Sequence, residues 1–227
     1  MRNLILTVAL LVGCTSYHQH YSIMESIPYS DLSEYYSPMP IGKGLDLGCG
    51  FGFFNSKPEN GNNTITLTPS LYTRIGIGVG DIGFIVTLPT ARDRTSLYGI
   101  NDIKLCSTTG PFCLGIDLGY GLGIGRVGMV GDFRGAVILG LSLGEVVFPY
   151  LSPGIHYYYY PYEKSGIIPT PSWTICPVYG LDGGIAFTTG SIKFVVGPSL
   201  LFGQEPKGDR IKYNIYQINV HLSIGLK

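Results

Sequence analysis

The stretch Phe112–Gly125 reads FCLGIDLGYGLGIG, and its two alternating sets of residues decide the fold. One set is five glycines with Cys113 and Asp117, and the other is wholly apolar: Phe112, Leu114, Ile116, Leu118, Tyr120, Leu122 and Ile124. A period of two is typical of a β-strand, and this run is longer than most strands. A face of glycine could not form a well-hydrated exterior, but it suits the inside of a narrow barrel whose large residues touch lipid. The stretch therefore predicts one strand of a membrane β-barrel.

The composition favours the same interpretation. The 227 residues suffice for one substantial domain, 33 of them are glycine, and only 13% are charged. Lysine plus arginine and aspartate plus glutamate each total 15, so no net field would attract nucleic acid. The mean hydropathy of +0.26 is high for a soluble protein, yet no apolar run approaches the roughly twenty residues of a membrane helix. Alternating barrel strands account for both observations.

About ten strand-like segments follow Lys43. We expect them at 44–54, 65–79, 82–89, 97–106, 112–125, 133–143, 146–159, 173–187, 191–202 and 212–226. Short turns (80–81, 107–111, 144–145, 188–190) alternate with longer, more charged connections (55–63, 90–96, 126–132, 161–172, 203–211). Outer-membrane barrels have short periplasmic turns and long external loops. An even count with the first strand rising from the periplasm therefore places both termini in the periplasm.

Charged residues fall on the inward phase of these strands. The predicted lumen set contains four acids and four bases: Asp46, Arg74, Asp102, Lys104, Asp117, Arg134, Asp182 and Lys193. A charge facing lipid would cost a few kcal/mol at the membrane midplane, which explains why the charged residues occupy inward positions. A ten-stranded barrel is narrow, so we expect paired charges to fill most of the lumen, which argues against a wide general porin. At the outer interface we expect an aromatic girdle formed by Tyr157 to Tyr160, Tyr162 and Trp173.

Four cysteines lie within the expected barrel. Cys106 and Cys113 flank a short turn on the lumen phase, so a cross-hairpin disulfide could form in an oxidising compartment. We interpret Cys49 and Cys176 as small apolar fillers.

The last strand carries His221 and Ser223 on the same lumen face. This spacing is similar to the His-x-Ser pair of a small family of outer-membrane lipid A deacylases. The resemblance implies a general base at His221 and a nucleophile at Ser223. Two polar lumen residues would give the same pattern, so no residue is assigned as catalytic. His18 and His20 are interpreted as solvated, and no metal or cofactor site is expected.

The N-terminus has the pattern of an export signal, with Arg2 before the apolar run Leu4–Val12. The following Leu11-Val12-Gly13-Cys14 resembles the bacterial lipobox. That resemblance implies cleavage before Cys14 and lipid attachment to it, and Thr15 at the next position fits sorting to the outer membrane. An ordinary cleavable signal is the alternative. The expected organisation is a signal peptide (1–13), a lipidated tether (14–43) and a β-barrel domain (44–227).

Over most of the mature chain the pattern resembles the small bacterial outer-membrane β-barrel class, with a lipoprotein-type signal peptide. The resemblance implies an all-β fold: a single antiparallel up-and-down transmembrane barrel. It implies outer-membrane lipid, the barrel-assembly machinery and the lipoprotein-sorting machinery as partners, although Lys227 stands where an aromatic last residue is common.

The function stays open at this point. A structural or surface-interaction barrel, with an external ligand that the sequence does not name, is favoured. A narrow transport or lipid-binding barrel is the first alternative. A periplasmic, lipid-tethered, ligand-binding barrel with its apolar residues inward is the second.

Overall fold

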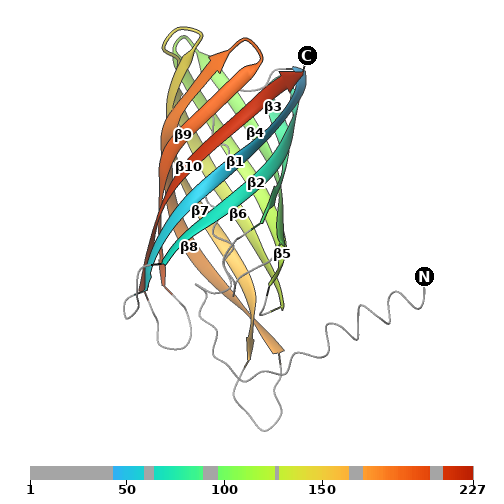
Figure 1. Ribbon diagram of the computed structural model, residues 1–227, viewed down its shortest axis with the longest axis vertical. Helices are drawn as coiled ribbons and strands as arrows, with labels where there is room; N and C mark the ends of the chain where they lie inside the picture. The colour runs from blue at the N-terminus through green and yellow to red at the C-terminus, as the bar shows by residue number, and fades with distance from the viewer. Residues whose placement is uncertain are drawn as a thin grey trace, which may run out of the picture.

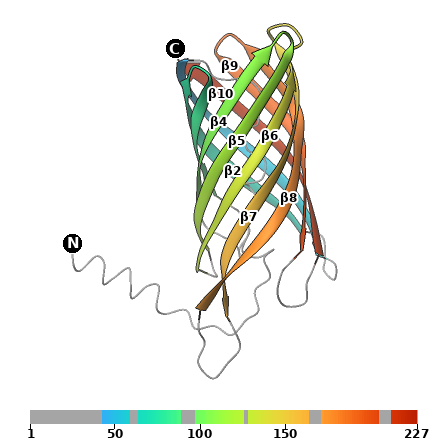
Figure 2. The same cartoon turned by 180° about the vertical axis from the view of Figure 1, so that it is seen from behind.

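The computed structural model describes residues 43–58, 64–88, 97–125, 128–163, 171–204 and 212–226. The predicted signal peptide, Cys14 and nearly all of the tether lie outside these residues. Ten strands are present: β1 (Lys43–Pro58), β2 (Thr64–Ile77), β3 (Gly80–Thr87), β4 (Leu97–Thr109), β5 (Phe112–Gly125), β6 (Gly128–Leu141), β7 (Val147–Glu163), β8 (Pro171–Thr189), β9 (Ile192–Gln204) and β10 (Lys212–Leu226). Each strand pairs antiparallel with its sequence neighbours, and β1 pairs with β10 to close the barrel (Figures 1 and 2).

The predicted strands are observed, with shifted ends. The ranges 112–125 and 212–226 agree with β5 and β10, whereas β6 begins at Gly128 instead of residue 133. The extension forms because Gly128 to Asp132 pair with Gly125 to Gly121 across the hairpin. The turn predicted at 80–81 is wrong, because both residues begin β3. The chain reverses at residues 78–79, where Gly78 has a φ of 96°, a conformation that glycine adopts without a steric penalty.

The short turns gather at one end of the barrel, together with the C-terminus, and we call this end the short-turn rim (Figure 1). Gly110, Gly144 and Gly190 each have a positive φ in these turns. The register pairs Lys43 with Ile77, so β1 also starts at this rim. Both ends of the barrel domain therefore lie at the same rim, as the even strand count predicts.

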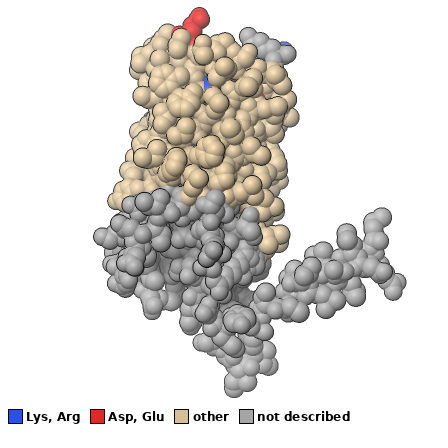
Figure 3. All heavy atoms as spheres, in the orientation of Figure 1, with Lys and Arg blue, Asp and Glu red and all other residues tan. Residues whose placement is uncertain are grey.

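Large hydrophobic side chains are exposed along the outer wall, and the described part of the face drawn in Figure 3 is almost free of charge. On β5 the seven large residues from Phe112 to Ile124 are 45–66% exposed, while Cys113 and Asp117 are buried on the other side. Because lipid hydrocarbon accepts apolar side chains and rejects charge, this arrangement is that of a transmembrane β-barrel. A soluble barrel with its apolar residues inward is not the fold observed. In the described residues, no helix is long and apolar enough to cross a membrane.

Prolines interrupt two seams of the wall. The register of β6 with β7 skips Val137 and Ile138, the first of which faces Pro153. The register of β8 with β9 skips Gly183 and Gly184, beside Pro198. Proline has no N–H to donate to a ladder, so both interruptions follow from its chemistry.

Candidate functional site in the barrel lumen

Arg74 from β2 is the centre of a buried ion-pair cluster. Its Nε lies 2.5 Å from Asp81 Oδ1 on β3, and its Nη2 lies 2.6 Å from Asp102 Oδ2 on β4. Lys104, also on β4, places Nζ 3.0 Å from the second oxygen of Asp81. All four side chains are buried. Such close geometry compensates part of the cost of removing the charges from water.

Asp117 and Arg134 extend this cluster across β5 and β6. Asp117 lies within electrostatic range of Asp102, Arg134 and Arg74. Together with Asp81 and Lys104, these residues form three acids and three bases on five consecutive strands. The cluster as a whole is therefore charge-balanced.

Glycines on neighbouring strands make room for these side chains. A Cβ added at Gly83 would collide with Asp102 and Arg74, and one added at Gly119 would lie 2.6 Å from Arg134 Nε. The same relation holds on β1, where Gly48 and Gly50 accommodate Tyr72 and His221. The glycine face seen in the sequence is therefore the space into which large lumen side chains fold.

A second ion pair closes the barrel seam. Lys193 Nζ on β9 lies 3.1 Å from Asp46 Oδ2 on β1, across the intervening β10. The two residues are 147 positions apart in the chain. Only closure of the sheet brings them together.

Asp132 and His156 belong to a third lumen group that the sequence did not reveal. Tyr98 donates a hydrogen bond to Asp132 Oδ1, and His156 Nδ1 lies 3.5 Å from Asp132 Oδ2. The His156 ring stacks on Tyr158, with centroids 5.8 Å apart. The expectation that Tyr158 belongs to the aromatic girdle is wrong: it alternates with the exposed Tyr157 and is buried in the lumen. The side chains of Tyr160, Tyr162 and Trp173 lie outside the described residues.

Asp182 on β8 lies at the end of a hydrogen-bond chain whose other members are uncharged side chains. Ser199 donates to Asp182 Oδ1, and Asn219 Nδ2 donates to Ser199 Oγ at 2.9 Å. Gln217 in turn donates to Asn219 Oδ1. The expected pairing of charges does not extend to Asp182, whose direct partner is a hydroxyl.

The structure places the eight predicted charged residues on the inner wall, seven buried and Lys193 partly exposed. It adds Asp81 and Asp132, which the sequence pattern had assigned to a turn and a loop. Among the described inward side chains, six carboxylates therefore face four bases: Asp46, Asp81, Asp102, Asp117, Asp132 and Asp182 against Arg74, Lys104, Arg134 and Lys193. Had the alternation of inward and outward residues been followed over the whole of Gly128–Leu141, it would have assigned Asp132 to the lumen.

Cys106 and Cys113 are free thiols that face the lumen near the short-turn rim. The register places Cys106 opposite Gly115 and Cys113 opposite Thr108, so the two are diagonal neighbours across β4 and β5. Their thiols hydrogen-bond to one another. Cys176 is fully buried and Cys49 half-buried, in keeping with small filler residues.

His221 and Ser223 both face the lumen on β10 and are buried. The His221 ring meets Tyr72 edge to face at 6.5 Å between centroids. Ser223 lies opposite Gly48 on β1 and Lys193 on β9. The two residues share a face, but their described contacts are those of packed lumen side chains.

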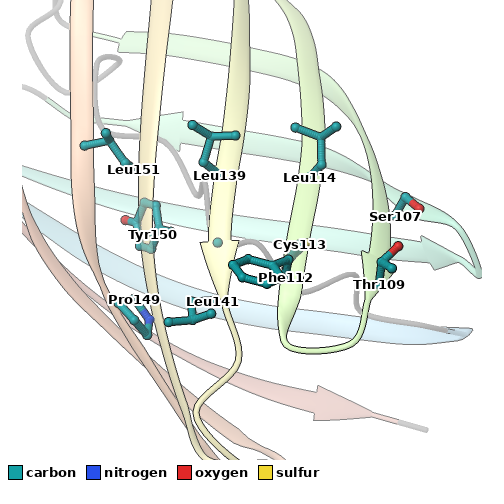
Figure 4. Close-up of a pocket in the computed structure, with 11 residues that line it drawn as sticks. Ser107, Thr109, Phe112, Cys113, Leu114, Leu139, Leu141, Pro149, Tyr150 and Leu151 are labelled. Carbon is teal, nitrogen blue, oxygen red and sulfur yellow. The ribbon is translucent and has the colours of Figure 1, made fainter.

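The outer wall is hollowed near the short-turn rim over β4 to β7, with a volume of about 600 Å³ (Figure 4). Leu114, Leu139 and Leu151 form one row of its lining, and Phe112, Leu141 and Pro149 lie beside them. Most of its lining side chains are on the lipid-facing side, and the lumen-facing Cys113 also contributes to it. Among the described residues there is no group of three or more His, Cys, Asp or Glu that could hold a metal ion.

A closed antiparallel sheet with an apolar exterior and a charged interior defines the class of this chain. It is an all-β transmembrane barrel of the bacterial outer-membrane type.

No protein-family model matches the chain, and no curated protein matches it. Among solved structures, it is similar to Neisserial surface protein A (NspA), with 10% identity, coverage of 81% of this chain and 98% of that one, and a TM-score of 0.43. It is also similar to the N-terminal β-barrel domain of Pseudomonas aeruginosa OprF (9% identity, 81% and 99% coverage, TM-score 0.35). For Ail of Yersinia pestis the values are 13% identity, 80% and 99% coverage, and a TM-score of 0.31. The class of this chain rests on its own geometry and not on these likenesses.

Proposed function

We propose that the protein is an outer-membrane barrel of the structural or surface-interaction type, with a largely filled lumen. The observation that carries this proposal is the Arg74 cluster, which spans β2 to β6 and whose side chains pack closely over Gly83 and Gly119. General solutes need a passage lined by hydrated side chains, whereas these charges are buried against one another. The work of the molecule would then fall to the longer connections at the rim opposite the short turns.

Single-channel recording in planar lipid bilayers tests the filled lumen. The wild-type protein is expected to show little or no steady conductance. Arg74→Ala removes the largest side chain of the cluster and should raise conductance severalfold. Leu118→Ala, on the outer wall, is the matched control and should behave as wild type. A large, steady conductance of the wild-type protein, unchanged in Arg74→Ala, would contradict the proposal.

Replacement of the connections tests the surface role. Residues 164–170, between β7 and β8, and residues 205–211, between β9 and β10, can each be exchanged for a glycine-serine linker. We expect the barrel to keep its heat-modifiable gel mobility while binding of whole cells to a host or matrix surface falls. Unchanged binding after replacement of every long connection would reject the surface-interaction role.

We further propose that Cys14 carries lipid and that the short-turn rim faces the periplasm. The lipobox-like sequence before Cys14 supports the first point, and the start of β1 and the end of β10 at one rim support the second. Wild-type protein should incorporate labelled palmitate, and Cys14→Ser should not. Labelling of the serine variant would place the lipid elsewhere.

A narrow transport barrel is the second candidate function. The described lumen has two more carboxylates than bases, which favours the passage of cations over anions. Any residual conductance in the recordings should then be cation-selective in a salt gradient. An anion-selective reversal potential would exclude this candidate.

A further inference from the structure

Asp182, in the middle of β8, contacts no base in the part of the chain that the structure describes. Asp46 and Asp81 contact lysines, Asp102 contacts Arg74, and Asp132 lies beside His156. Asp182 instead accepts a hydrogen bond from Ser199. Arg134 acts on it only through longer-range electrostatics, and Tyr150 is the other titratable group near it.

The surroundings of Asp182 are built from oxygen atoms. Ser152 on β7 lies directly opposite Asp182 on the same lumen face and is fully buried. Among the described residues, its Oγ has no hydrogen-bond partner. Ser199 lies directly opposite on the other side, on β9. The carboxylate is thus flanked by one hydroxyl on each neighbouring strand.

Asn219 orients the Ser199 side of this arrangement. Its amide nitrogen donates to Ser199 Oγ, so the Ser199 proton is directed at Asp182 and an oxygen lone pair stays available. Gly180 and Gly184 occupy the two adjacent inward positions on β8 and project no side chain over the carboxylate. The carboxylate is therefore held in place by the hydroxyl of Ser199.

A buried carboxylate without a compensating positive charge is costly, since desolvation of an ion in a protein interior costs several kcal/mol. The orphaned Ser152 hydroxyl adds a second unfavourable group at the same place. One bound cation would remove both costs. Oxygen ligands suit hard cations, and a single carboxylate balances one positive charge; divalent sites generally use more carboxylates, and transition metals favour nitrogen or sulfur.

We propose that Asp182, Ser152 and Ser199 form a binding site for a hard monovalent cation of the Na⁺ type in the lumen wall. The cation bridges β7, β8 and β9 beside the proline-interrupted seam of β8 and β9. It therefore ties together strands at a place where backbone pairing is incomplete.

The test uses the full-length protein folded in detergent micelles. Its thermal unfolding midpoint is measured by heat-modifiable gel mobility at constant ionic strength, in chloride salts of Na⁺, K⁺ or the bulky cation N-methylglucamine. We expect the wild-type midpoint to rise by several degrees in Na⁺ relative to N-methylglucamine and to saturate with Na⁺ concentration. Asp182→Asn and Ser152→Ala should lose this dependence. Asp46→Asn, which removes a lumen carboxylate paired with Lys193, should retain it.

Three results would overturn the proposal. The first is a wild-type midpoint that is the same in all three salts. The second is a Na⁺ dependence of the midpoint that persists in Ser152→Ala. If Asp182→Asn folds, the dependence would persist in it as well. The third is a midpoint that depends on pH but not on the cation, which would show that a proton neutralises Asp182. Because Ser152→Ala removes only one hydroxyl, it tests the site even where Asp182→Asn fails to fold.

Discussion

Arg74 joins carboxylates of β3 and β4 through separate nitrogens of one guanidinium group. Its replacement leaves Asp81 with only Lys104 and leaves Asp102 without its closest positive partner. Removal of one member of a buried ion pair is far more costly than removal of an exposed one, because the remaining charge stays buried.

Arg74→Ala is therefore expected to lower the free energy of unfolding by about 3–5 kcal/mol, measured by urea titration in lipid vesicles. Lys193→Ala, in a pair that is partly exposed, is the control and should cost clearly less. An equal loss in both variants would mean that burial does not set the strength of these pairs.

At the scale of elements, β8 and β9 approach closely where their ladder is interrupted. A Cβ added at Gly197 would collide with the backbone oxygen of Gly183 and with Gly184 Cα. Backbone atoms cannot swing away as a flexible side chain can. At Gly99, on the outer side of β4, the atoms nearest to an added Cβ would be 3.9 Å away, which is ordinary van der Waals contact.

Gly197→Ala should therefore separate β8 from β9 and lower the free energy of unfolding by about 1–3 kcal/mol. Gly99→Ala should stay within about 0.5 kcal/mol of wild type. Urea unfolding of the two variants side by side checks this, and a fully stable Gly197→Ala would show that the seam can widen without penalty.

The hairpin of β4 and β5 carries the other element-scale prediction. Because Cys106 and Cys113 are in thiol–thiol contact, we expect them to be oxidised to a disulfide after export, by thiol–disulfide exchange with a protein disulfide of that compartment. In a variant that lacks the other cysteines, a mass-tagged maleimide added under denaturing conditions should label neither residue before reduction and both after it. Labelling of both without reduction would show that they remain thiols.

At the scale of the whole molecule, the apolar wall decides whether the barrel inserts. Leu118, in the middle of β5, is 61% exposed on the lipid-facing side. Leu118→Arg is expected to cost about 2–4 kcal/mol of folding free energy in a bilayer, because arginine would lie near the midplane. Thr109→Arg, at the end of β4 beside the turn, should cost about 0–1 kcal/mol. Equal folded fractions of the two variants on heat-modifiable gels would contradict a membrane-spanning wall.

By itself, the sequence determined the class, the strand count and the inner and outer faces, because these depend on alternation along a single strand. The run from Phe112 to Gly125 is enough to show an apolar outside and a glycine inside. The predicted boundaries were less accurate at β3 and β6. Asp81 and Asp132 were assigned to a turn and a loop because charged residues are common in turns and loops.

Only the tertiary structure decided which lumen residues meet. Lys193 reaches Asp46 because the sheet closes. Arg74 reaches Asp81 and Asp102 because the strand register places the three residues at nearby levels along the barrel. Asp182 faces Ser152 and Ser199, and no base, for the same reason. Alternation assigns a side chain to the lumen, whereas register and closure select its neighbours, and those are relations between strands that no single stretch of the chain contains.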